Sequence, residues 1–243
     1  MNILLDTHTH TIASTHAYST VIEMAHQAKK AGLEAIAITD HAPAIPDGAH
    51  PWHFLNLKAV PREICGVKIL YGAEVNILDI DGNIDLDEDI LSKLDVVNAS
   101  IHRPCYKNVG ESDHTSAYMS VVKNPFVDII CHSGSPDFRY DYERVIDMAK
   151  KNNKLIEINN HSFFVRKASI PNCKKIAEIC KEKGVGIVVA SDAHIAFELG
   201  DYSCALDMLR EISFPEKLIM NRNLNAFEEF MKSKGKELFK WGY

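Results

Sequence analysis

Short apolar segments recur along this chain at nearly regular intervals, and they constrain its fold more than any other feature. Most are rich in Ile and Val and about four to eight residues long, which is typical of buried parallel strands. Their sequences are ILLDTHTH from Ile3, EAIAITD from Glu34, VKILYGAEV from Val67, LDVVNASIH from Leu94, FVDIICH from Phe126, KLIEINN from Lys154 and GVGIVVASDAH from Gly184. We therefore expect seven strands in a parallel sheet.

Helical patterns separate these strands. They are predicted over residues 20–30, 86–91, 115–122, 142–151, 170–183, 206–212 and 224–231, and Gly32 and Gly184 stand where left-handed helix caps are needed. Strands that alternate with helices form βα units around a parallel sheet, so the fold class is α/β. No Gly/Ser-rich or Pro-rich linker divides the 243 residues, and we expect one domain over residues 1–243.

The charge and the cysteine content limit which partners and which cellular compartment we expect. The net charge is −6, with 27 basic against 33 acidic residues, so no broad cationic face is expected for long nucleic acid. The six cysteines are scattered without a C-x-x-C pair, which favours reduced thiols in a cytoplasmic protein. The first residues lack the charged region and the apolar core of a signal peptide, so we expect none. No run of about 18 apolar residues is present to span a membrane, so we expect no membrane partner.

Potential metal ligands follow six of the seven predicted strands. Because the carboxyl ends of parallel strands meet at one edge, these side chains should converge. His8 and His10 are two residues apart and therefore share a face of the first strand. The full set of expected ligands is His8, His10, His16, His41, Glu74, His102, His132, Asp192 and His194. This concentration predicts a polynuclear metal site.

The ligand types indicate the metal and the reaction. Imidazole and carboxylate without thiolate suit zinc, manganese or iron, and nine ligands with one bridging carboxylate can hold three divalent ions. Two ions about 3.5–4 Å apart can share an activated hydroxide and clamp a displacement at phosphorus. The ions also bring positive charge to a net acidic protein, as a phosphate ester requires. We therefore expect metal-assisted phosphoester hydrolysis.

The series DTHTH, ITDH, GAE, SIH, ICH and SDAH resembles the PHP (polymerase and histidinol phosphatase) family over roughly residues 1–200. The stretch HAPAIPDGAHPWHFLNLKAVPRE, followed by GVKILYGAEVNI, is most similar to its YcdX-type phosphatases. The resemblance implies a distorted (β/α)7 barrel, similar to a TIM barrel, and a trinuclear zinc centre. Carried over by position, His8, His10, Glu74 and Asp192 would hold one ion, Glu74, His102 and His132 a second, and His16, His41 and His194 a third.

On this basis we expect hydrolysis of a phosphomonoester, either a small phosphorylated metabolite or a nucleotide, by a hydroxide bridged between ions. Glu74 would bridge two ions, and Asp192, His194 or a metal-bound water would protonate the leaving oxygen. Arg103 directly follows His102 and is a candidate for binding the substrate phosphate. Arg139 and Arg166 are further candidates, and a homo-oligomer is left open.

Other residues around the site also carry expectations. The long, proline-rich loop after His41 is a candidate lid or substrate wall. Asn159 and Asn160 follow the sixth strand and are expected to hydrogen-bond to the metal ligands.

Three alternatives stay open. An amidohydrolase also begins its barrel with H-x-H and cleaves C–N bonds, but no strand here ends in the Lys that would carry a bridging carbamate. Within the PHP family, a histidinol phosphatase or a nuclease acting on nucleotide ends fits the same ligands. A non-catalytic, metal-stabilised module is the third alternative, and the complete ligand set argues against it.

Overall fold

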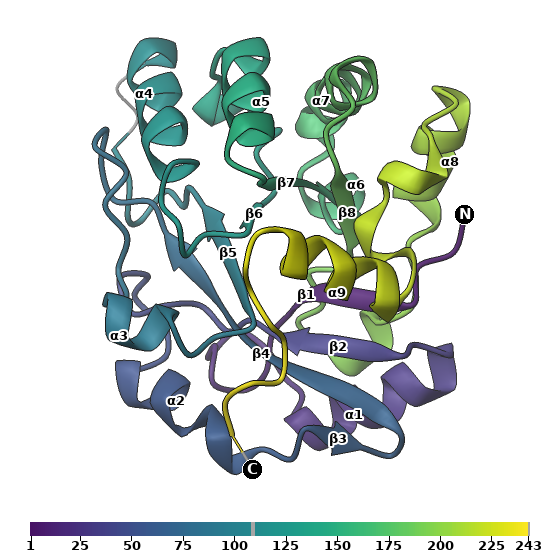
Figure 1. The fold of residues 1–243 in the computed structure, drawn as a ribbon. Coiled ribbons are helices and arrows are strands. Elements are labelled where there is room, and N and C mark those ends of the chain that lie inside the picture. Colours follow the sequence, from purple (N-terminus) through teal and green to yellow (C-terminus); the bar gives the residue numbers. More distant parts are fainter. Residues whose placement is uncertain (108–109, 243) are drawn as a thin grey trace.

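The computed structural model describes residues 1–107 and 110–242, and its centre is one eight-stranded sheet that curves into a nearly closed barrel (Figure 1). Seven strands are parallel and follow one another in the order β1-β2-β4-β5-β6-β7-β8. They are β1 (Leu5–Thr9), β2 (Ala35–Ile38), β4 (Val67–Asn76), β5 (Val96–Ser100), β6 (Ile129–Ile130), β7 (Leu155–Asn159) and β8 (Ile187–Ala190). The seven expected parallel strands and the TIM-like barrel are confirmed.

The barrel closes between its first and last strands. Thr9 and Ala193 form a parallel bridge, and the His10 amide donates to the Ala193 carbonyl at 2.9 Å. The Asp192 amide donates in turn to the His8 carbonyl at 3.0 Å. These bonds join the carboxyl ends of β1 and β8, so residues at the two ends of the ligand series lie side by side.

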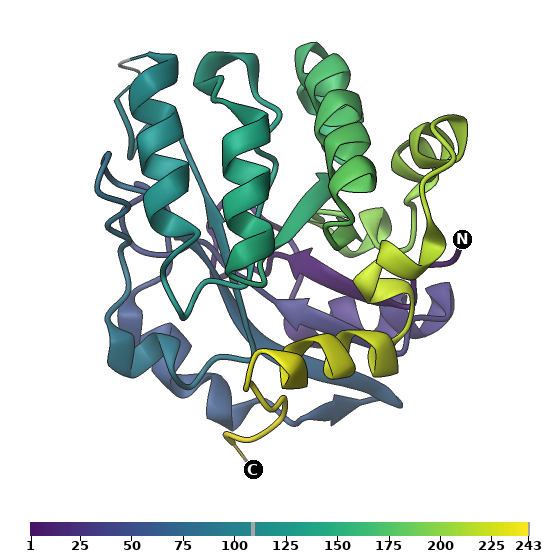
Figure 2. The ribbon, with the colours of Figure 1, turned by 45° about the horizontal axis from the view of Figure 1, so that its top comes forward.

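Helices cover the outside of the barrel (Figure 2). They are α1 (Val21–Ala31), α2 (Pro51–Asn56), α3 (Glu88–Leu91), α4 (Glu111–Val121), α5 (Tyr142–Lys151), α6 (Ser162–Val165), α7 (Ile170–Lys183), α8 (Ser203–Glu211) and α9 (Leu224–Ser233). Thr20 and Glu23 form a capping box at the start of α1. Gly32 and Gly184 adopt left-handed backbone after α1 and α7, and these expected caps are confirmed.

The apolar interior has two parts. A large core lies between the strands and the outer helices, and a smaller one fills the barrel with residues such as Leu5, Leu70 and Val188. Phe227 and Met231 of α9 are fully buried against this inner core. Because the inner core lies toward the amino ends of the strands, α9 closes the barrel there and leaves the opposite mouth to the polar residues.

One strand and two α-helices in the described residues were not expected from the sequence. β3 (Glu63–Ile64) pairs antiparallel with β4, while α2 and α6 occupy segments that we expected to be loops. α2 begins at Pro51 and is capped by the His50 imidazole, which accepts from the Trp52 amide at 3.1 Å. None of the helices in the described residues is long and apolar enough to cross a membrane.

Candidate metal centre

Side chains from the carboxyl ends of the strands meet at the open mouth of the barrel. His8 lies in β1, Glu74 lies in β4, and both are fully buried. His41, His132 and Asp192 lie two or three residues past the ends of their strands and are also buried. His16 reaches in from the loop after β1, and its side chain is 45% exposed. The structure brings together all nine residues that the sequence indicated.

The best-defined part of the cluster is a group of four ligand atoms on His8, His10, Glu74 and Asp192. The two Nε2 atoms are 3.1 Å apart, and His8 Nε2 lies 3.3 Å from Glu74 Oε2 and 3.5 Å from Asp192 Oδ1. His10 Nε2 lies 3.5 Å from the same Glu74 oxygen and 3.2 Å from the same Asp192 oxygen. A tetrahedral zinc ion with bonds of about 2.0–2.1 Å has ligands about 3.3 Å apart. The two imidazoles are therefore spaced from each other and from both carboxylates as ligands of one zinc ion would be, and His8, His10 and Glu74 together offer ligand atoms close enough for one ion.

Glu74 presents its two carboxylate oxygens to different sets of histidines. Oε2 faces His8 and His10, and it is also 2.8 Å from His41 Nδ1. Oε1 is 2.8 Å from His132 Nε2 and 3.4 Å from His102 Nε2. The carboxylate therefore has the geometry of a bridge between two cation positions, with one oxygen on each side.

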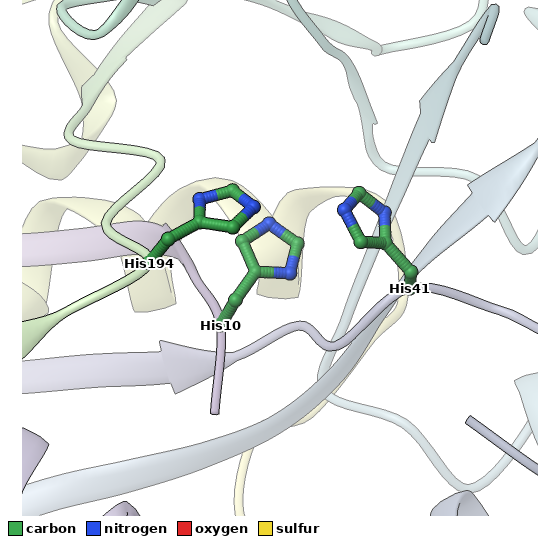
Figure 3. Close-up of side chains that lie close together, drawn as sticks. All are labelled: His10, His41 and His194. Atoms are coloured by element: carbon green, nitrogen blue, oxygen red, sulfur yellow. The ribbon is translucent and has the colours of Figure 1, made fainter. Parts of the chain in front are cut away.

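Stacked imidazoles form the outer part of the cluster. Figure 3 shows His10, His41 and His194 turned toward one another from three different segments, and the three together offer ligand atoms close enough for one ion. His16 Nε2 lies 2.9 Å from His194 Nε2, and its ring centroid lies 5.0 Å from that of His41. The three histidines that the resemblance assigned to a third ion are therefore neighbours.

Two atoms in this cluster fit a cation better than a hydrogen bond. His41 Nδ1 and Glu74 Oε2 are buried and 2.8 Å apart, but neither has a hydrogen-bond partner in the described part of the chain. A buried polar atom without a partner costs free energy, so native structures rarely leave one. Divalent cations at the cluster would satisfy these two atoms, and the nitrogen and oxygen donors of the cluster are those that zinc accepts.

A buried carboxylate orients the innermost histidine. His8 Nδ1 donates to Glu157 Oε1 at 2.7 Å, which leaves its Nε2 lone pair directed into the cluster. The other oxygen of Glu157 accepts from the His132 amide at 2.8 Å and from Asn159 Nδ2 at 3.1 Å. His102 is oriented in the same way, because its Nδ1 donates to Asn76 Oδ1 at 2.7 Å. The sequence analysis did not identify Glu157 or Asn76.

Two of the ligand candidates have unusual backbone conformations. His132 has a φ of 28° and Asp192 a φ of 54°, in or near the left-handed region that residues other than glycine seldom adopt. Such conformations persist only where their surroundings hold them in place. Here the His132 amide is held by Glu157 and the Asp192 amide by the His8 carbonyl. Both residues are therefore held in these conformations at the cluster, where their side chains turn into the mouth.

The electrostatics of the cluster favour bound positive charge. Burial lowers the pKa of His10 to about 3, so this imidazole is neutral and keeps a free lone pair. Burial would raise the pKa of Glu74, but His8, His41 and His102 outweigh it and hold that pKa well below its usual range. Burial would likewise lower the pKa of His8, yet Glu157, Glu74 and Asp192 raise it well above the usual value. The field of the carboxylates therefore stabilises a cation at this position.

A cavity of about 370 Å³ opens beside the cluster and is lined by His102 and His132. Arg103 and Arg166 also line it, and Arg166 Nη1 lies 3.4 Å from Asp192 Oδ2. Arg139 lines a different cavity, together with Glu111 and Lys175. Of the three arginines indicated by the sequence, the structure therefore places two at this cavity, and one of them, Arg166, contacts the cluster.

The two asparagines after β7 have different surroundings. Asn159 Nδ2 donates to Asp192 Oδ2 at 3.1 Å, so it contacts a ligand candidate as expected. Asn160 instead donates to the Asp201 carbonyl and accepts from the Ala205 amide, which fixes the loop before α8. The expectation that Asn160 also contacts the ligands is wrong, because its amide group is already used by that loop.

The fold and the cluster together define an α/β-barrel protein with a buried site for cations at the carboxyl ends of its strands. The model of the PHP domain family matches residues 6–161, and the chain belongs to this family. A relative from Acetivibrio thermocellus, named "Probable phosphatase", is 48% identical over 234 residues, covering 96% of this chain and 97% of its own. A relative from Thermoanaerobacter sp., also named as a probable phosphatase, is 47% identical over 98% of both chains.

A solved structure supports the fold. The histidinol phosphate phosphatase of Lactococcus lactis, crystallised with zinc, L-histidinol and phosphate, matches with a TM-score of 0.61. The match covers 87% of this chain and 93% of that chain at 18% identity. At this identity the similarity shows that the two proteins share the barrel fold.

Proposed function

We propose that this protein is a metal-dependent hydrolase of the phosphatase class, which cleaves the phosphomonoester bond of small phosphorylated metabolites or nucleotides at a trinuclear zinc centre. One observation carries the proposal. The Nε2 atoms of His8 and His10 lie 3.1 Å apart, and each lies 3.2–3.5 Å from Glu74 Oε2 and Asp192 Oδ1, the spacing expected between ligands of one zinc ion. The relatives named as probable phosphatases support the same reaction class.

In the proposed ligand sets, each of the two Glu74 carboxylate oxygens belongs to a different ion. The first ion takes His8 and His10 with Glu74 and Asp192. The second takes His102 and His132 with the other Glu74 oxygen, which faces both of these imidazoles. The third ion takes the remaining neighbouring imidazoles, those of His16, His41 and His194.

When bound, such ions supply an activated water and neutralise the charge that grows on the phosphoryl oxygens. The surrounding residues orient the substrate and the ligands. Arg166 lies against Asp192 at the edge of the cavity, where its guanidinium can donate to a phosphoryl oxygen. Asn159 fixes the Asp192 carboxylate from behind, and the Asp192 carbonyl accepts from His194 Nδ1 at 2.8 Å, which leaves the Nε2 lone pair free for a metal.

Replacing Glu74 with Gln tests the proposal, because the amide keeps the shape of the side chain but loses the charge and one acceptor oxygen. We expect phosphate release from glycerol 3-phosphate to fall below about 1% of the wild-type rate, a larger loss than the 10- to 100-fold typical of residues that only support a ligand. We also expect fewer metal ions per chain. Circular dichroism checks that the barrel still folds.

Glu63→Gln is the matched control, since Glu63 is an exposed residue of β3 that pairs with Lys68. This variant should keep both turnover and metal. A Glu74→Gln protein that retains full phosphatase activity would contradict the proposed centre.

A further inference from the structure

The cavity beside His102 and His132 has a local charge opposite to that of the whole chain. Arg103, Arg166 and Lys167 line it, against one carboxylate, Asp137. The chain as a whole carries a net charge of −6. A cavity lined mainly by basic side chains, on a protein with a net negative charge, is suited to an anionic ligand.

The three basic side chains differ in whether they contact the cluster. Arg166 contacts Asp192 and is therefore within reach of a phosphoryl group held there. Arg103 is 73% exposed and pairs with Asp137 across the rim. Lys167 is exposed and has no ion-pair partner within residues 1–107 and 110–242. In those same residues no hydrogen bond or ion pair joins the side chain of Arg103 or Lys167 to the nine ligand candidates.

Apolar side chains form the other walls of the cavity. Ile101 and Phe138 are buried residues of this lining, and Val165 contributes an exposed apolar surface. Such walls suit the carbon skeleton of a small leaving group, whereas the exposed cations suit a charged end of it. A ligand that spans the cavity from the cluster would therefore carry anionic groups at two positions.

We propose that this cavity binds the leaving group of the ester, and that Arg103 and Lys167 bind a second anionic group on it, either a carboxylate or a phosphate. The inference rests on the proposed function, because the cluster must first hold the reacting phosphoryl group. Arg166 then binds that phosphoryl group, and Arg103 and Lys167 determine which substrate is preferred.

Three esters with a glycerol-sized skeleton test this proposal. Glycerol 3-phosphate has an uncharged end, 3-phosphoglycerate has a carboxylate there, and glycerol 1,3-bisphosphate has a second phosphate. We expect kcat/KM to be at least about tenfold higher for one or both of the doubly anionic esters, since a hydrogen bond to a charged group has an effect of that size. Which of the two esters gains identifies the second anion.

Replacing Lys167 with Gln distinguishes binding of the second anionic group from binding of the reacting phosphoryl group. If Lys167 binds the second anion, the variant reduces the preference, expressed as the ratio of kcat/KM values, by several-fold. Lys151→Gln is the control, because Lys151 is an exposed residue on the last turn of α5 and does not line the cavity. It should leave the preference unchanged.

The outcomes distinguish the two proposals. If wild-type protein loaded with zinc hydrolyses none of the three esters, the proposed function fails. Equal kcat/KM for all three would overturn the second-anion site and leave the phosphatase intact. An equal loss for all three esters in Lys167→Gln would also overturn it, because Lys167 would then contact the reacting phosphate.

Discussion

Glu157 is the single residue on which the inner geometry of the cluster most depends. It is 4% exposed, and it accepts hydrogen bonds from His8 Nδ1, the His132 amide and Asn159 Nδ2. One carboxylate therefore fixes the ring of one ligand candidate, the backbone of a second and the asparagine that supports a third. No other residue could replace it without breaking at least one of these bonds.

Replacing Glu157 with Gln should weaken metal binding while the direct ligands stay in place. An amide cannot accept on both sides, so either His8 or the His132 amide loses its partner. We expect metal affinity to fall about 10- to 100-fold, as for other residues that orient a histidine ligand. Competition with a chelator of known affinity measures the change, and turnover at saturating metal should recover in part. Unchanged affinity would show that Glu157 does not position the ligands.

At the residue scale the sequence predicted the ligand candidates, but it did not predict all of the residues that hydrogen-bond to them. His102 and His132 directly follow or end an apolar run, so their place at the mouth of a parallel barrel follows from topology alone. Glu157 lies inside the run LIEIN, where the pattern indicates a core strand. A signal was present nonetheless, because a charged residue inside a buried strand requires a buried partner.

At the scale of elements, the segment after α9 is tied to the amino-terminal rim of the barrel. Asp128 directly precedes β6 and is fully buried, and it pairs with Lys234 at 2.5 Å and with Lys236 at 2.6 Å. The Phe239 amide donates to Asp95, which precedes β5. These contacts fasten the chain after α9 across the end of the barrel that α9 closes (Figure 1).

The Asp128 pairs predict a pH dependence of stability. Burial would raise the pKa of Asp128, but Lys236 and Lys234 outweigh it and hold that pKa below its usual value. The stabilisation is therefore complete above the unfolded pKa of about 4, and it is lost as the pH falls through the lower folded pKa. Asp128→Asn should cost about 3–5 kcal/mol at pH 7, and its difference from wild type should shrink below about pH 3.5.

Urea unfolding at neutral and acidic pH measures this difference. Asp147→Asn is the matched control, because Asp147 is half exposed and its pair with Lys183 should contribute less than about 1 kcal/mol. A penalty for Asp128→Asn that is the same at pH 7 and pH 3 would show that the ionised pair does not hold this segment.

The elements themselves were predicted where their patterns are long. The apolar periods gave the seven parallel strands and the main outer helices, whereas α2 was missed because proline and histidine at its start resemble a loop. In the structure Pro51 is the first helical residue, where its missing amide hydrogen costs nothing, and His50 takes the capping place usually filled by Ser, Thr, Asp or Asn. β3 has only two residues, too few to show a period.

At the scale of the whole molecule, the closure of the barrel creates the cluster. β1 and β8 meet through the bonds of His10 with Ala193 and of Asp192 with His8. His8 and His10, at the start of the ligand series, are thereby brought to within 3.5 Å of Asp192, near its end. The chain order of the ligand series could be read from the sequence. Their distances could not, because they depend on how the sheet curves and where it closes.

The count of metal ions per chain tests the central claim most directly. Elemental analysis of protein purified without chelator, and again after saturation with zinc, should give close to three ions per chain. Removal of the ions with a chelator should abolish phosphate release from glycerol 3-phosphate, and zinc should restore it. Two or fewer ions per chain after saturation would show that His16, His41 and His194 do not form a third site and would contradict the trinuclear centre.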